Sequence, residues 1–202
     1  MGGVGEQERR ESLLAAAKAV FAREGYHRAT VRDIAREAGV ATGTFYLYFS
    51  SKEACLLGLI EEFYRRLMAR IVEARAGRGS VLEKLAASVA AVVCAFAAER
   101  DLARIVLIQA AGAHPAFDAR LAQLHADFAR LVEEDLAEAV EAGLLPPQDT
   151  GVTAVALIGA VHEVIVAWLR EGRPADLEAA LPALSCFCLR GAGAGVAERR
   201  VQ

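Results

Sequence analysis

The chain has 202 residues, of which 55% are hydrophobic and 24% charged, with only 5 prolines. This composition excludes an intrinsically disordered chain and a small scaffold built on disulfides, and it favours a packed, Ala- and Leu-rich helical protein. The net charge of −3 is unevenly divided, because residues 1–52 hold 8 Lys/Arg against 6 Asp/Glu while the remainder is acidic. A polyanionic partner is therefore expected at the N-terminal end only.

Three helices are predicted in the first quarter of the chain. Apolar residues at intervals of three and four predict a helix over residues 8–24, after a frayed N-terminal tail. Thr30 followed by Asp33 has capping-box spacing, which predicts a short helix over 31–38. Gly39 then ends this helix, and a second short helix is expected over 42–49.

The rest of the chain is predicted to be helical as well. Ser50 and Glu53 repeat the capping-box spacing at the start of a long helix that ends near residue 76. Residues 80–98 are apolar nearly all round, as expected of a helix buried in a bundle. Glycine and proline breaks separate four further predicted helices, over residues 102–112, 115–142, 150–170 and 175–189. The terminal GAGAGVAERRVQ is expected to be disordered.

The two short helices and the helix before them have the pattern of a helix-turn-helix, whose second helix can enter the DNA major groove. Phe45 and Phe49 are four residues apart and share a face that is expected to be core. Thr42 and Tyr46 share another face, which carries no charge and suits hydroxyl contacts and thymine methyl groups. Cations on the flanking helices are expected to attract phosphates.

The run TVRDIAREAGVATGTFYLYFSSKE, which starts at Thr30, resembles the DNA-binding signature of the TetR family of bacterial transcriptional regulators. The resemblance implies an all-α fold, with a three-helix helix-turn-helix DNA-binding domain over residues 1–52 and a helical-bundle ligand-binding and dimerisation domain over 53–202. It also implies a cytoplasmic homodimeric repressor that binds a double-stranded, pseudo-palindromic operator. A small hydrophobic effector would release that repressor from DNA.

Matching the family's pattern position by position implies a set of DNA contacts. Base contacts fall to Arg32, Thr42, Gly43 and Tyr46, and contacts with the phosphate backbone fall to Thr30, Thr44, Leu47, Tyr48 and Lys52. Two positions depart from the pattern, because Ala41 stands where a capping serine is frequent and Thr42 where a longer, often basic side chain is common. Alternatives remain at four residues. Tyr46 and Tyr48 could pack against the next helix, Arg36 could be a solvated charge paired with a neighbouring acid, and Lys52 could support the helix that Ser50 caps.

The effector site is sought among polar and aromatic side chains set between apolar neighbours. These candidates are Phe63, Phe96, Gln109, His125, Phe128, His162 and Trp168. Ordinary core packing is the alternative for each of them. Glu163, beside His162, is a candidate partner for a basic side chain of the second subunit across a dimer interface. The small residues Ala156, Gly159 and Ala160 permit close helix approach, so this helix and the last one are expected to form an intersubunit four-helix bundle.

No motif for catalysis is found in the sequence. It contains no HExxH, GxSxG or Walker-type loop, and its four histidines and four cysteines lack metal-ligand spacing, so neither an enzyme nor a metal site nor a cofactor is expected. The apolar segment 151–169 is interrupted by a histidine and a glutamate, which favours a buried helix over a membrane span. The rival hypothesis is a helical ligand-binding or scaffold protein whose helix-turn-helix does not bind DNA.

Overall fold

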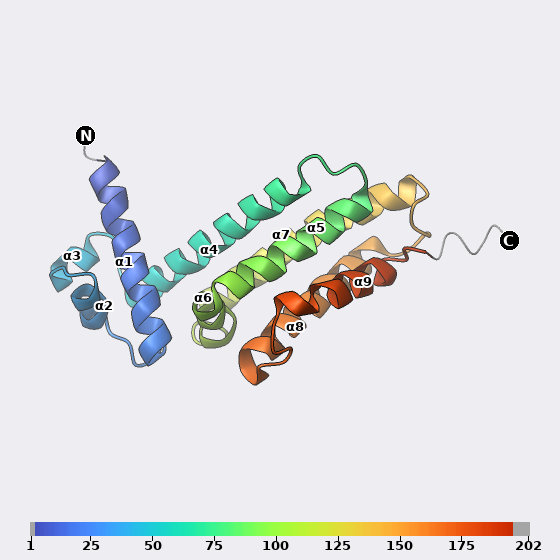
Figure 1. Cartoon of the computed structure of the whole chain (residues 1–202). Helices are drawn as coiled ribbons and strands as arrows, with labels where there is room; N and C mark the ends of the chain where they lie inside the picture. The colour runs from blue at the N-terminus through green and yellow to red at the C-terminus, as the bar shows by residue number, and fades with distance from the viewer. Residues whose placement is uncertain (1–2, 196–202) are drawn as a thin grey trace. The chain divides into compact units, whose positions relative to one another are not determined.

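The structure is a computed structural model that describes the backbone of residues 3–195 and the side chains from residue 5 to 195. Every regular element in this part of the chain is helical (Figure 1), which confirms the predicted all-α class. The elements are α1 (Gly3–Glu24), α2 (Val31–Glu37), α3 (Thr42–Tyr46), α4 (Lys52–Arg75), α5 (Val81–Ala98), α6 (Arg100–Arg104), the π-helix η1 (Ile105–Gln109), α7 (Pro115–Glu141), α8 (Thr150–Glu171), the 3₁₀-helix η2 (Glu178–Ala180) and α9 (Leu181–Gly191).

The chain divides into two compact units that do not follow a single cut in the sequence. Unit 1 contains the residues up to Arg65 together with Arg100–Ala119, and unit 2 contains Arg66–Glu99 together with the residues from Arg120 onward. The helices α4 and α7 each run without interruption from one unit into the other. The predicted functional boundary after residue 52 stays a prediction.

The starts of the first helix and of the long helix α4 differ from the sequence prediction. Within the expected frayed tail, residues 3–7 are helical, because α1 begins at Gly3, and a hydrogen bond of 2.7 Å between the side chains of Gln7 and Glu11 supports its first turns. The long helix α4 is capped one residue later than predicted. Ser51, not Ser50, accepts the N–H of Ala54 through its hydroxyl at 3.1 Å.

The predicted helix over 102–112 is instead two short elements. The α-helix α6 passes directly into η1, where the N–H of Ala110 reaches back five residues to the carbonyl of Ile105 at 2.8 Å. Such π-type turns are rare and are frequently found at functional sites. The last predicted helix, over 175–189, likewise begins later, at Leu181, after a short 3₁₀ turn, and Pro182 occupies its first turn.

In unit 1, α1 packs against α2, α6 and η1, and α2 packs against α3. Phe45 and Phe49 are buried with ring centroids 5.7 Å apart, which confirms their predicted place in the core. Gly58 allows α4 to lie close to this core. A Cβ atom added there would stand 3.2 Å from the ring of Phe49 and 3.3 Å from Leu14, so a larger residue would require these two side chains to shift.

In unit 2, α5 packs against α8, α9 and η2, and α8 packs against α9. An ion pair lies inside this unit: Arg75 donates two hydrogen bonds of 2.6 Å to the carboxylate of Asp135 and one of 3.2 Å to the hydroxyl of Ser88. The bond to Asp135 raises the pKa of the Arg75 guanidinium. Because Asp135 is only 4% exposed, loss of either partner would leave a buried charge without its counter-ion.

Two helices of unit 2, α5 and α8, are long and apolar enough to cross a membrane by length and composition alone, with mean hydropathies of 1.9 and 2.0. The core helix of a soluble protein passes the same test. Within the chain only 28% of the α5 window and 33% of the α8 window is buried. Most of the remaining α5 residues are half-buried, whereas α8 exposes Val152 and Val155.

The turn between α2 and α3 depends on Gly39, whose φ of +68° lies in the left-handed region. We expect Gly39→Ala to lower the free energy of unfolding by about 1 kcal/mol, because a Cβ is disfavoured in this conformation. Gly43→Ala is the matched control, since Gly43 is helical, has a negative φ and has open space around it. Urea unfolding followed by circular dichroism measures both variants. Equal stability of the two would contradict the requirement for glycine at the turn.

Candidate nucleic-acid interface

The helix-turn-helix begins at a capping box that the sequence predicts correctly. The N–H of Asp33 donates to the Thr30 hydroxyl at 3.2 Å, and the N–H of Thr30 donates to the Asp33 carboxylate at 3.1 Å. The Thr30 hydroxyl also donates to this carboxylate, and this bond is the main cause of the lowered pKa of Asp33. Both donors of Thr30 thus serve the cap. Its predicted phosphate contact stays a prediction that requires the hydroxyl to leave Asp33.

The two arginines of α2 have different surroundings. Arg36 donates to Asp33 at 2.7 Å, so the alternative of a solvated charge paired with a neighbouring acid is correct for Arg36. Arg32 is exposed on the same short helix. The predicted reach of Arg32 to bases stays a prediction, and its exposure leaves it accessible to DNA.

The short helix α3 separates inward from outward residues as helical spacing predicts. Phe45 is fully buried, whereas Tyr46 is 54% exposed and Leu47 81% exposed. Thr42 and Gly43 are exposed as well. Thr44 and Tyr48, with predicted phosphate contacts, are half-buried. An exposed surface of hydroxyl, methyl and ring groups without charge therefore covers the outer side of α3, and such a surface can approach base edges in a major groove.

The helix α3 starts without a side-chain cap, because Ala41 stands where the family often has a capping serine. This residue is the N-cap with extended backbone geometry, and its side chain makes no capping hydrogen bond. Its carbonyl accepts the N–H of Thr44 at 2.9 Å. A serine cap normally stabilises a helix start by about 1 kcal/mol, so α3 depends on the packing of Phe45 rather than on its own N-terminus.

Lys52, predicted to hold a phosphate and with support of the next helix as the alternative, makes structural contacts to a different segment. Its ammonium donates to the carbonyls of Tyr26 and Ala29 at 2.9 and 3.0 Å and lies 4.4 Å from the centre of the Tyr26 ring. An ammonium has three N–H donors, so one remains for a phosphate. The phosphate contact stays a prediction, and the structure adds that Lys52 holds the segment leading into α2.

Tyr26 is the residue around which this segment is organised. It is buried, its hydroxyl donates to Glu53 at 3.0 Å, and its ring meets the ring of Phe117 edge-on at 5.5 Å. Burial, and secondarily the bond to Glu53, raises the pKa of the Tyr26 hydroxyl. No local sequence pattern reveals this role of Tyr26, because its partners are distant along the chain.

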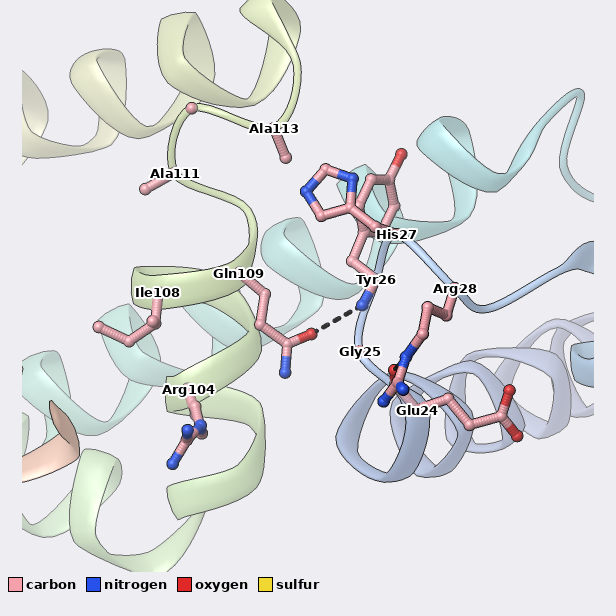
Figure 2. A pocket seen from close by; sticks show the side chains of 11 residues that line it. Glu24, Gly25, Tyr26, His27, Arg28, Arg104, Ile108, Gln109, Ala111 and Ala113 are labelled. Carbon is pink, nitrogen blue, oxygen red and sulfur yellow. Dashed lines mark hydrogen bonds between the residues drawn. The ribbon is translucent and has the colours of Figure 1, made fainter.

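A pocket of about 410 Å³ adjoins Tyr26 within unit 1. Figure 2 shows residues 24–28, from the end of α1 and the turn after it, facing residues of the segment 104–113. The side-chain carbonyl of Gln109 accepts the backbone N–H of Tyr26 at 3.0 Å across this space. Gln109, a candidate effector residue from the sequence, is thus a hydrogen-bond partner of the helix-turn-helix segment.

The other effector candidates fall in both units. Phe63 belongs to unit 1 and is buried, with its ring edge-on to Tyr64. Five candidates lie in unit 2: Phe96, His125, Phe128, His162 and Trp168. Phe96 and Trp168 are buried there, and the imidazoles of His125 and His162 stand side by side with ring centroids 5.1 Å apart. Effector contact by any of these residues stays a prediction.

Two family models match the chain. The model of bacterial regulatory proteins of the tetR family matches residues 13–59, and a tetracyclin repressor-like C-terminal domain matches residues 78–191. The fatty acid metabolism regulator protein of Bacillus subtilis (strain 168) is 26% identical over 168 residues, which are 83% of this chain and 87% of that protein. The resemblance found in residues 30–53 is thus extended to both parts of the chain.

Solved structures agree with this result. The fatty acid degradation regulator FadR from Bacillus halodurans is 29% identical, with a TM-score of 0.82 over 90% of this chain and 94% of that one. FadR from Bacillus subtilis, solved in complex with stearoyl-CoA, is 24% identical with a TM-score of 0.81 over 90% and 98% of the two chains. The second likeness shows the fold alone.

The double role of Lys52 can be tested by substitution. We expect Lys52→Met to lower the free energy of unfolding by about 1–2 kcal/mol, because two carbonyls lose a charged donor, and to weaken DNA binding. Arg32→Met is the matched control, since it removes an exposed cation nearby and is expected to weaken DNA binding without changing the melting temperature. Thermal melts and fluorescence-anisotropy titrations measure both. An unchanged melting temperature for Lys52→Met would contradict the structural role.

Proposed function

The chain belongs to the TetR family of bacterial regulatory proteins and is a ligand-responsive, DNA-binding transcriptional regulator, and we propose that it is a homodimeric repressor released from a pseudo-palindromic operator by a long-chain acyl-CoA. The relatives and the family are regulators rather than enzymes. The proposed site of action is the cytoplasm, where both the operator and acyl-CoA thioesters are found.

The observation that supports DNA binding is that uncharged and cationic residues occupy separate places on the helix-turn-helix. The outer side of α3 is exposed and uncharged at Thr42, Gly43 and Tyr46, while the cations Arg32 and Lys52 flank it on α2 and α4. Phosphate contacts fix the position of a protein on the duplex, and contacts with base edges select the sequence. We therefore assign affinity to the flanking cations and sequence preference to α3.

The observation that favours an acyl-CoA effector is the apolar character of unit 2. Its helix α5 has a mean hydropathy of 1.9, and the buried aromatic side chains Phe96 and Trp168 lie in this unit. Sites for small molecules are mostly apolar with a few polar groups. Two relatives are named as fatty acid regulators, and a protein of the same fold was solved with stearoyl-CoA.

The route from effector to DNA is proposed to run through the segment 100–119. This segment belongs to unit 1, but α7 continues from it into unit 2, and α5 of unit 2 ends directly before it, at Ala98. Gln109 in this segment holds the backbone of Tyr26, four residues before the cap of α2. A shift of α7 on effector binding would therefore strain or break this hydrogen bond and change the position of the helix-turn-helix.

The dimer is proposed to form through α8 and α9. These helices pack against each other and expose an apolar face, with Val152 67%, Val155 63% and Phe187 57% exposed. Gly159 on this face has open space where a Cβ would stand, which allows a second helix to approach closely. Glu163 on α8 and Arg190 on α9 are exposed as well. In a twofold interface they can pair twice, each with the partner's residue of opposite charge.

Operator binding is tested with DNA from the region upstream of the chain's own gene. We expect binding that is at least tenfold tighter than to random DNA at moderate salt and that weakens as salt rises. Tyr46→Phe is expected to weaken operator binding about tenfold through loss of one hydroxyl contact, with an unchanged melting temperature. Phe45→Leu, its buried neighbour, is expected to lower the melting temperature instead. Equal affinity for operator and random DNA would contradict the proposal.

The effector is tested on the same operator complex. Stearoyl-CoA is expected to weaken operator affinity at least tenfold, whereas free CoA is expected to have no such effect because it lacks the apolar chain. Trp168 is the only tryptophan of the chain, so its fluorescence reports binding to unit 2 independently of DNA. If stearoyl-CoA changes the fluorescence but leaves operator affinity intact, it is a ligand without the proposed releasing effect. No change in either signal rejects this effector class.

The dimer is tested by placing a charge on the α8–α9 face. Phe187→Glu is expected to shift the protein from dimer to monomer in sedimentation velocity and to weaken operator binding at least a hundredfold, because only one recognition helix then meets the DNA. Val72→Glu is the matched control, since Val72 on α4 is similarly exposed, at 64%, but is not part of this face. A dimer that persists in Phe187→Glu would contradict the proposed interface.

A further inference from the structure

A pair of histidines in unit 2 meets in space although the sequence keeps its members far apart. His125 lies on α7 and His162 on α8. Both are half-buried, and their ring centroids are 5.1 Å apart with the ring planes at 82°. Sequence spacing alone gave no chelating pattern, because neither histidine has a second potential ligand at helical spacing.

We propose that His125 and His162 form a binding site for a late first-row divalent cation such as Zn²⁺. Two imidazoles bound to one tetrahedral Zn²⁺ at Zn–N distances of about 2.0–2.1 Å have ring centres about 5 Å apart. The observed separation of 5.1 Å matches this value, so the backbone of α7 and α8 already holds the rings at a chelating distance. Binding requires that one nitrogen of each ring turn toward a common ion.

Charged side chains near the two rings act in opposite directions on a cation. Arg170 and Glu163 both act electrostatically on His162. The positive charge of Arg170 opposes a cation, whereas the negative charge of Glu163 attracts one.

The site has two protein ligands and open coordination positions. In the part of the chain that the structure describes, no group of three or more His, Cys, Asp or Glu side chains is placed to hold a metal ion. Water, or a donor atom of a bound effector, would complete the coordination. Closed sites with four protein ligands are structural, so an open site of two histidines is suited to reversible binding that links α7 to α8.

Titration of the full-length, metal-free protein with ZnSO₄ by isothermal calorimetry tests the site. We expect one ion per chain with sub-millimolar affinity at pH 7.5, and affinity at least tenfold weaker in His125→Gln and in His162→Gln. His27→Gln is the matched control, because His27 is exposed and belongs to unit 1, and it is expected to bind as the parent does. Binding should also weaken below pH 6, as protons compete for the rings.

Two outcomes would overturn the proposal. The first is unchanged Zn²⁺ affinity in both His→Gln variants, which would place any bound ion elsewhere. The second is the absence of sub-millimolar binding to the parent protein. If the variants fail to fold, NMR of the histidine imidazoles in the parent protein tests the site instead. Zn²⁺ must then shift the ring resonances of two of the four histidines, and shifts confined to His27 and His114 reject the site. None of these readouts depends on DNA or acyl-CoA, so the proposed function can fail or hold separately.

Discussion

The position of the helix-turn-helix depends on a buried tyrosine whose backbone and side chain are held from three directions. The carbonyl of Tyr26 accepts from Lys52, its N–H donates to Gln109, and its hydroxyl donates to Glu53. These partners come from α4 and η1, elements that follow the DNA-binding helices in the chain. A polar group buried without a partner is costly, so the turn after α1 has few low-energy alternatives, and α2 begins where this turn leaves it.

The same arrangement explains why the sequence predicted a phosphate contact for Lys52 but not its hydrogen bonds to two backbone carbonyls. Its place at the start of α4, beside a recognition helix, indicates a phosphate contact, and that inference uses only local order along the chain. The two carbonyls that it binds belong to a turn more than twenty residues earlier, at Tyr26 and Ala29. The bonds close a loop that no periodicity or motif encodes. The residue therefore contributes to the shape of the interface in addition to its charge.

Features that depend on neighbouring residues in the sequence were predicted correctly. The cap at Thr30 and the inward placement of Phe45 follow from spacing along one helix, and both are present. Spacing along one helix did not predict that Ser51 rather than Ser50 caps α4, nor the π-turn that ends at Gln109. The same holds for the meeting of the two histidines on α7 and α8. Residues that meet only after folding leave no periodic signal, so the effector region was less predictable than the DNA-binding region.

The uncharged outer side of α3 has a consequence for the way in which the protein responds to its ionic environment. No Asp, Glu, Lys, Arg or His occurs between residues 38 and 51, so any base contacts that α3 makes would release no counterions when they form. Lys52, predicted to contact a phosphate, would release them at every DNA sequence alike. Arg32, which the family pattern places near a base, lies outside α3. A change in cellular salt would thus alter how much of the DNA is occupied more than the sequence preference that α3 supplies.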